Sequence, residues 1–253
     1  MIPYLARLLG ITMNYNAYPG NWKKAIVLPI YKVRDRSVFG NYRPVSLTSV
    51  FCKQMEHVTS GYLRQIWEMS GWLSVGQHGF RPEYSCESQV VTVCQDIANS
   101  LDNGVRSDVI TPVFSKVFDL VPHDRLITKI VATGVDLRVG VWVKKFLLGR
   151  SQRVRVDRQL SEKVRVTSGV PQGSALGSLV LHTYVNDICK NIEFKIRLFA
   201  DDGIIYRKIM DSSHTDNLQM DLNKLGKWAV ENEMKINPGK SKAVGFPKAR
   251  VKE

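Results

Sequence analysis

The sequence is short of features that define several large classes of protein. Its four cysteines, Cys52, Cys86, Cys94 and Cys189, lie far apart with no CxxC pair, which argues against a zinc site or a disulfide framework. No apolar run reaches the ~20 residues that span a bilayer, and residues 1–20 lack the charged start and cleavage site of a signal peptide. We therefore expect reduced thiols and an intracellular protein with no membrane partner.

Acidic residues are also scarce relative to basic ones. The 253 residues include 36 Lys plus Arg and 23 Asp plus Glu, giving a formal net charge of +13. This excess favours a polyanionic partner, either nucleic acid or an acidic membrane surface. A membrane-surface protein needs an amphipathic helix with a wholly basic polar face. The amphipathic stretch 215–233 contains Asp216, Asp221, Glu231 and Glu233, so nucleic acid is the better hypothesis.

The remaining composition is that of a folded protein, with 44% hydrophobic and 23% charged residues. Hydrophobic periodicity and turn residues predict an α+β order of elements. The predicted helices are 45–67, 85–101, 122–133, 137–148, 176–188 and 215–233, and the predicted strands are 24–31, 108–114, 195–200, 203–207 and 243–246. Residues 152–167 predict a two-stranded ribbon whose basic face (Arg153, Arg155, Lys163 and Arg165) either contacts a nucleic-acid backbone or is an ordinary solvated surface.

Two adjacent carboxylates, Asp201 and Asp202, fall at the tip of the predicted hairpin 195–207. Two acidic side chains this close repel each other unless a cation neutralises them, so they indicate a divalent metal site. Asp is also a common turn residue, and the pair alone would favour an ordinary exposed turn. The upstream loop 169–177 (GVPQGSALG), which opens a helix, reverses that balance.

These two blocks resemble motifs B and C of the reverse transcriptases of LINE-type, jockey-like retrotransposons, which lack long terminal repeats. Further blocks follow the order of that family across almost the whole chain. They are WKKA with PIYK (22–32) and NYRPVSL (41–47), which resemble fingers segments, QHGFR (77–81), which resembles the next segment, FSKVFD with VPHD (114–124), which resembles motif A, and NPGKSK (237–242), which resembles motif D. A chance match of this length and order is very improbable.

The resemblance implies an α+β right-hand polymerase fold. Residues 1–106 would form the fingers and residues 107–253 the palm, whose antiparallel sheet has helices on one face, and the thumb would be missing. The family's reaction is attack of a primer 3′-hydroxyl on the α-phosphate of a dNTP, with two Mg²⁺ ions holding the attacking and leaving oxygens. The implied partners are an RNA template, a DNA primer and dNTPs, in the cytoplasm and nucleus, with the oligomeric state left open.

The resemblance also assigns roles to individual residues. In motif C, Asp201 would be the metal ligand and Asp202 its partner. Residues that would contact the substrates are Lys32 and Arg43 at the triphosphate, Phe118 as the steric gate under the sugar, Gln172 and Gly173 at the template and incoming base, and Lys240 as the proton donor to pyrophosphate. Ordinary alternatives are a core aromatic for Phe118 and a solvated side chain for Lys240.

Motif A departs from the family at its most important position. Val113 stands where the family has the aspartate that bridges both metal ions. Asp108 lies five residues away on the opposite side of an extended strand, about 16 Å distant, and Asp119 lies beyond the strand. We expect weakened Mg²⁺ binding and nucleotidyl transfer slower by several orders of magnitude. The alternatives are a catalytically dead nucleic-acid-binding remnant, and a sequence error, because Asp and Val codons differ by one base. His182 stands where the family has an apolar residue. We interpret it as an ordinary helix histidine.

Overall fold

The structure, a computed structural model, describes residues 2–32, 35–200 and 202–247. The chain divides into two compact units, each made of two stretches of sequence. Unit 1 comprises Met1–Trp72 and Phe118–Leu181, and unit 2 comprises Leu73–Val117 and His182–Glu253. The chain passes between the units within α4 (Val117–Leu120) and within α7 (Ala175–Val185). The units therefore interleave in sequence, whereas the division into fingers and palm at residue 106 stays a prediction.

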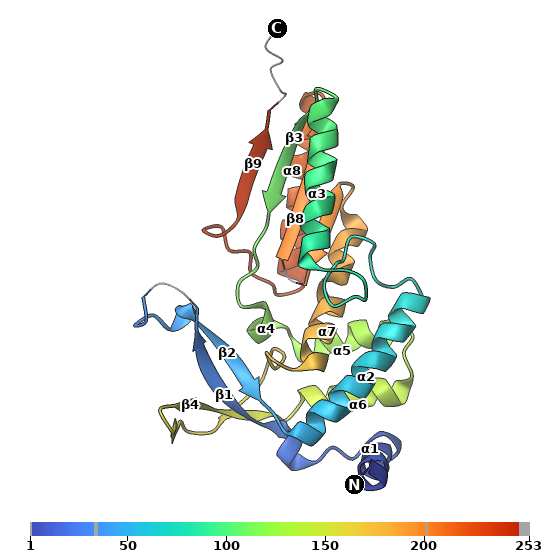
Figure 1. The fold of residues 1–253 in the computed structure, drawn as a ribbon, viewed down its shortest axis with the longest axis vertical. Helices are drawn as coiled ribbons and strands as arrows, with labels where there is room; N and C mark the ends of the chain where they lie inside the picture. Colours follow the sequence, from blue (N-terminus) through green and yellow to red (C-terminus); the bar gives the residue numbers. More distant parts are fainter. Residues whose placement is uncertain (1, 33–34, 201, 248–253) are drawn as a thin grey trace. The chain divides into compact units, whose positions relative to one another are not determined.

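Unit 1 combines a small sheet with a layer of helices (Figure 1). Its elements are α1 (Ile2–Asn14), η1 (Gly20–Lys23), β1 (Lys24–Tyr31), η2 (Phe39–Asn41), β2 (Tyr42–Leu47), α2 (Val50–Met69), α5 (His123–Ala132), α6 (Leu137–Leu147), β4 (Ser151–Val156), β5 (Gln159–Leu160) and β6 (Val164–Arg165). The strand order is β2-β1-β4-β5, with β6 also pairing with β4. β1 is antiparallel to β2 and parallel to β4.

Large aromatic side chains form the helical core of unit 1. Trp142 and Phe146, four residues apart on one face of α6, are fully buried and their rings stack at 6.1 Å. Trp67 of α2 is also fully buried, and its indole Nε1 donates a 2.8 Å hydrogen bond to the hydroxyl of Thr133 at the end of α5. The first contact stabilises one face of α6, and the second joins α2 to the end of α5.

The ribbon predicted at 152–167 is present in a different form. It consists of three short strands, β4, β5 and β6, rather than two. Val154, Val156 and Val164, which alternate with basic residues along the ribbon and so predict an apolar face, are exposed. The alternation of valine with basic residues therefore predicted the extended conformation correctly, but the valine side chains are not buried. No helix in the described part of the chain is both long and apolar enough to cross a membrane.

Unit 2 is built around a four-stranded antiparallel sheet. Its elements are α3 (Cys86–Asp102), β3 (Arg106–Thr111), η3 (Asn186–Asn191), β7 (Lys195–Phe199), β8 (Asp202–Ile209), α8 (Ser212–Glu231) and β9 (Lys242–Phe246), and the strand order is β7-β8-β3-β9. α3 begins at a capping box, in which the Ser85 hydroxyl accepts a hydrogen bond from the backbone N–H of Ser88 at 3.1 Å. This local signal explains why the start of α3 was predicted correctly.

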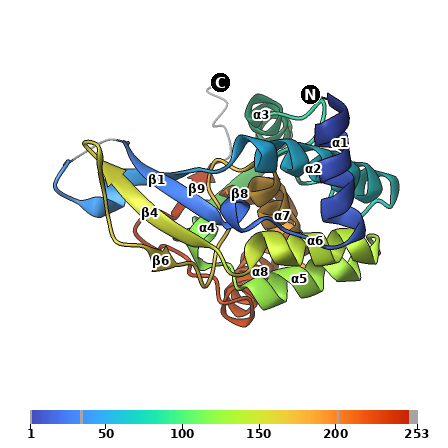
Figure 2. The same cartoon turned by 90° about the horizontal axis from the view of Figure 1, so that it is seen from below.

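The expectation that helices cover only one face of this sheet is wrong. Ile205 and Tyr206 are consecutive residues of β8, and their exposed fractions are 0% and 4%. Because successive side chains of a strand point to opposite faces, both faces must be covered. Tyr206 packs with Val93 and Ile97 of α3, and Figures 1 and 2 place the sheet between α3 and α8. The fold remains α+β, with helices flanking the sheet.

Candidate functional site

Val113 lies directly beside the acidic hairpin of unit 2. Just beyond β3 it forms an isolated antiparallel bridge with Asp202, the first residue of β8. Residues paired in this way have Cα atoms about 5 Å apart. The predicted proximity of residue 113 to the hairpin is thus confirmed at Asp202, which is exposed, whereas Asp201 lies outside the described residues. A half-buried side chain without oxygen atoms therefore adjoins the carboxylate.

The turn that carries Lys240 wraps around the same strand end. The backbone N–H of Asn237 donates to the carbonyl oxygen of Val113 at 2.7 Å, and the backbone N–H of Val113 donates to Ser241 Oγ at 3.1 Å. The Lys240 side chain is exposed, and its backbone N–H closes the turn onto the Asn237 carbonyl oxygen at 3.2 Å. The structure thus gathers three predicted positions, Val113, Asp202 and Lys240, around one strand end.

Residues 76–79 lie along the outer edge of β7. Leu198 donates its N–H to the carbonyl oxygen of Gly76 at 2.8 Å, and its carbonyl oxygen accepts from the N–H of His78 at 2.7 Å. A Cβ atom on Gly76 would lie 2.3 Å from the carbonyl oxygen of Ile196, and one on Gly79 would lie 2.6 Å from the backbone nitrogen of Ala200. Both positions require glycine for this close backbone approach, so residues 76–79 border the hairpin along the outer edge of β7.

His182 is buried against this supporting segment. Its side chain is 1% exposed, and its ring meets the ring of Phe80 edge to face at 5.7 Å. Within the described residues neither imidazole nitrogen has a hydrogen-bond partner. Burial, and to a lesser degree the positive charge of Arg81, lowers the pKa of His182 to about 3. His182 is therefore a neutral, unpaired polar group in the core, whereas the sequence predicted an ordinary helix histidine.

In unit 1, the loop 169–177 is anchored first to the segment that follows motif A. The N–H of Gly169 donates to the carbonyl oxygen of Val121 at 2.8 Å, and the N–H of Val170 donates to that of Phe118 at 2.7 Å. Gly169 has a φ of +78°, and a Cβ atom there would lie 2.3 Å from the Phe118 oxygen. Only glycine fits this approach, which explains why the loop begins with it.

A second anchor is a buried carboxylate that the sequence did not reveal. Glu56 of α2 is 0% exposed, and its Oε2 accepts a 2.5 Å hydrogen bond from Ser174 Oγ. Ser174 Oγ in turn accepts from the backbone N–H of Gly177 at 2.8 Å. On the other side of the loop, the N–H of Ser46 in β2 donates to the carbonyl oxygen of Gln172 at 2.8 Å. The loop is thereby held between α2 and β2.

The predicted substrate-contacting residues of unit 1 lie around this loop and the β1–β2 hairpin. Arg43 is exposed and stands opposite Ile30 in the ladder, three residues along β2 from Ser46. Lys32 is also exposed, and its N–H bonds the carbonyl oxygen of Asn41 at 2.9 Å. A cavity of about 60 Å³ between β2, β4 and the loop is lined in part by Pro44, Ser46, Asp119, Arg150 and Gln172. Gly173, at φ +93°, is exposed beside Val45.

Mg²⁺ is bound through oxygen ligands, which the side chain of Val113 does not have. The described residues contain no group of three or more His, Cys, Asp or Glu side chains able to hold a metal. Asp108 is bound by Arg106 at 2.7 and 2.9 Å and stands opposite Arg207 in the ladder. Asp119 belongs to unit 1 and lines its cavity. Asp108 is therefore already paired with a cation within unit 2.

Comparison with known proteins assigns the chain to a class of nucleic-acid polymerases. The model of the family "Reverse transcriptase (RNA-dependent DNA polymerase)" matches residues 30–249, so the chain belongs to that family. It is 29% identical over 250 residues to a probable RNA-directed DNA polymerase from transposon BS, and 30% identical over 252 residues to one from transposon X-element, both of Drosophila melanogaster. These alignments cover 95% and 94% of the chain and 28% of each relative.

A third relative extends the same group. The RNA-directed DNA polymerase from mobile element jockey of Drosophila melanogaster is 25% identical over 255 residues, covering 97% of this chain and 28% of its own length. The chain thus spans little more than a quarter of these relatives. An apo telomerase from Candida tropicalis, truncated from its C-terminal domain, matches with a TM-score of 0.61 at 10% identity, over 98% of this chain and 56% of that one. The resemblance to LINE-type reverse transcriptases is confirmed, and the structural match shows the shared fold.

Proposed function

We propose that the chain is the polymerising core of an RNA-directed DNA polymerase from a retrotransposon without long terminal repeats. In this proposal residues 1–106 are the fingers and residues 107–253 the palm, and the substrates are an RNA template, a DNA primer and dNTPs. The observation that carries it is the bridge between Val113 and Asp202. The residues that the resemblance assigns to motifs A and C are thus neighbours in the chain's fold at Asp202, which supports a shared site.

The substrate contacts proposed for unit 1 follow from its anchored loop. Arg43 and Lys32, both exposed at one end of the β1–β2 hairpin, would hold the triphosphate. Gln172 would reach the template and incoming base, because Ser46 and Glu56 fix the loop on either side of it. Phe118 would lie under the sugar and disfavour a 2′-hydroxyl.

We further propose that nucleotidyl transfer is impaired in this copy by Val113. The family generally uses Mg²⁺, and an aspartate at this position would supply an oxygen ligand that valine lacks. Asp201 and Asp202 would remain as the acidic pair, with Lys240 available on the neighbouring turn to protonate pyrophosphate. The position of Asp108 supports this account, because its carboxylate is bound by Arg106.

The test is primer extension on an RNA template with dNTPs and Mg²⁺. The unaltered chain, Val113→Asp and Val113→Asn are compared, each fused to a thumb from a related element. We expect Val113→Asp to extend the primer at least about 100-fold faster than the unaltered chain, because it restores a charged oxygen ligand. Val113→Asn, which has the same shape without the charge, serves as the matched control and should restore much less.

Equal extension by the unaltered chain would show that another group binds the metal and that the motif A interpretation is wrong. The second candidate function is a non-catalytic nucleic-acid-binding remnant, which the exposed basic residues Arg153, Arg155 and Lys163 of the β4–β6 ribbon favour. If no variant extends the primer while all bind a template–primer duplex with the usual salt dependence, the remnant is the better description.

A further inference from the structure

Unit 2 contains a cavity of about 360 Å³ far from the acidic turn. It opens where β7 begins and β8 ends, and its lining includes Lys195 and Tyr206, the first pair of the β7–β8 ladder. The last pair of that ladder is Phe199 and Asp202. Four residue steps separate the two ends, or about 13 Å. The volume falls in the range of cavities that hold small ligands, roughly 300–1,000 Å³.

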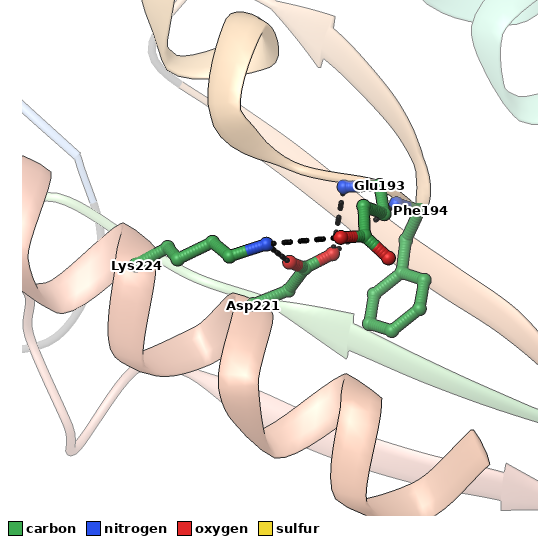
Figure 3. A network of polar contacts seen from close by, with 4 residues as sticks. All are labelled: Glu193, Phe194, Asp221 and Lys224. Atoms are coloured by element: carbon green, nitrogen blue, oxygen red, sulfur yellow. Dashed lines mark hydrogen bonds and ion pairs between the residues drawn. The ribbon is translucent and has the colours of Figure 1, made fainter. Parts of the chain in front are cut away.

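One wall of this cavity is held by a buried carboxylate, shown in Figure 3. Asp221 of α8 is 1% exposed, and its Oδ2 accepts hydrogen bonds from the backbone N–H groups of Glu193 at 2.9 Å and Phe194 at 3.2 Å. Its Oδ1 pairs with Lys224 Nζ at 2.8 Å, and the same ammonium meets Glu193 Oε1 at 3.4 Å. The turn entering β7 is therefore fixed, and the negative charge of Glu193 is directed to Lys224.

The other carboxylate of the lining is also neutralised. Asp96 of α3 accepts the hydroxyl of Tyr206 at 2.6 Å and pairs with Lys195 Nζ at 2.9 Å. With Glu193 engaged by Lys224, both acidic side chains of the cavity already have cationic or hydroxyl partners. The lining holds two acidic side chains, Asp96 and Glu193, and three basic ones, Lys195, Arg207 and Lys208, which leaves an excess of one positive charge for a ligand.

Two cations of the lining remain available. The guanidinium of Arg207 lies over the ring of Phe194, with Cζ 4.2 Å from the ring centroid, and it is half-buried. Asp108, opposite Arg207 in the ladder, is bound by Arg106 instead. Lys208 is exposed, and among the described residues neither Arg207 nor Lys208 forms an ion pair. The cavity therefore offers a flat cation held on an aromatic ring, with an ammonium next to it in the chain.

We propose that this cavity binds one nucleotide at the edge of β8 just beyond the start of β7, where Arg207 and Lys208 reach the phosphate from the two faces of the sheet, with the base against the guanidinium stacked on Phe194. A guanidinium binds two phosphate oxygens at once, an ammonium adds a point charge, and bases stack on guanidinium planes. The site goes beyond polymerisation and does not depend on it. The nucleotide comes either free from solution or as one unit of a single-stranded nucleic acid.

Binding is measured on the full chain by calorimetry with adenosine 5′-monophosphate, ribose 5-phosphate and a single-stranded adenine hexanucleotide. We expect Arg207→Met to weaken binding of the monophosphate at least about tenfold, and Lys208→Ala to weaken it by several-fold. Arg207→Lys keeps the charge but not the plane and should also weaken it. Lys227→Ala, which removes an exposed cation elsewhere in unit 2, should leave it unchanged.

Photolabelling with 8-azidoadenosine 5′-monophosphate then locates the base, and labelled peptides should come from residues 193–214. A hexanucleotide that binds no tighter than the monophosphate indicates free nucleotide, whereas much tighter binding that Arg207→Met also weakens indicates a single strand. The proposal is overturned if ribose 5-phosphate binds as well as the monophosphate, if an acidic peptide competes equally, if the label falls outside this segment, or if no variant of Arg207 or Lys208 changes binding. If Arg207→Met fails to fold, Arg207→Lys and the exposed Lys208→Ala decide the outcome.

Discussion

Replacing His182 with leucine should remove a specific pH dependence from the stability of the protein. The imidazole is 1% exposed and has no hydrogen-bond partner among the described residues. Burial and Arg81 lower its pKa from 6.5 to about 3. The unfolded chain therefore takes up a proton below pH 6.5 that the folded protein cannot accept. Stability is complete above that pH and declines as the pH falls towards 3.

The magnitude follows from the difference in pKa. Each pH unit between the two values reduces the free energy of unfolding by ~1.4 kcal/mol. Between about pH 7.5 and about pH 5 the unaltered protein should lose about 2 kcal/mol from His182 alone. His182→Leu eliminates this loss. At neutral pH the leucine also removes two unpaired buried nitrogens, each of which costs about 1–3 kcal/mol, so the variant should be at least as stable.

The assay is urea unfolding of both proteins across this pH range, because the difference between them cancels every other titrating group. His57→Leu, which removes an exposed imidazole from α2, is the matched control. We expect the stability curves of the unaltered protein and His182→Leu to diverge by about 2 kcal/mol at the acidic end. Parallel curves would show that His182 is hydrated or paired in solution, and the argument from burial would be refuted.

Two further perturbations test the supports of the site. Gly79→Ala should destabilise the protein by about 2 kcal/mol or more, because its Cβ would lie 2.6 Å from the Ala200 nitrogen. Gly61→Ala in α2, with open space around it, should instead increase the free energy of unfolding by about 0.5–1 kcal/mol. Thermal unfolding that ranks the two variants the other way would contradict the close packing at Gly79. Glu56→Ala should cost about 2–3 kcal/mol, because the Ser174 hydroxyl loses its acceptor. Hydrogen exchange in loop 169–177 should rise in this variant, and unchanged exchange would argue against the anchor. Glu56→Gln retains an acceptor, so exchange equal to that of the unaltered protein would argue against the need for the charge of Glu56.

Elements with local signals were predicted well from the sequence. β1 was predicted at its observed bounds, and α3 follows a capping serine. β2 was missed because Gly40, Asn41 and Pro44 resemble a turn, yet β2 is an edge strand, where proline is tolerated. The helix expected from residue 45 begins only at Val50, after the strand ends. The pairing with β1 decided the conformation of this segment, and pairing between distant residues leaves little trace in local periodicity.

The candidate site shows the same division. Val113 and Asp202 could be placed together because two motifs of one family fall on adjacent strands. Glu56 could not be found in this way, because its partner Ser174 lies 118 residues further along the chain and nothing in the sequence marks α2 as a carboxylate donor to that loop. His182 was noticed as an unusual residue, but its burial arises from residues 76–79 passing behind the hairpin, which is a tertiary contact.

The segment 76–79 also determines where the sheet of unit 2 can be extended. Its hydrogen bonds to Leu198 occupy the outer side of β7, which would otherwise be an open sheet edge. Open edges recruit strands from other molecules and are common sites of aggregation. At the opposite edge, no strand in the described part of the chain pairs with the outer side of β9. A strand added to this sheet, from the same molecule or from another, would therefore join at β9, and the edge beside the acidic turn is protected from such association.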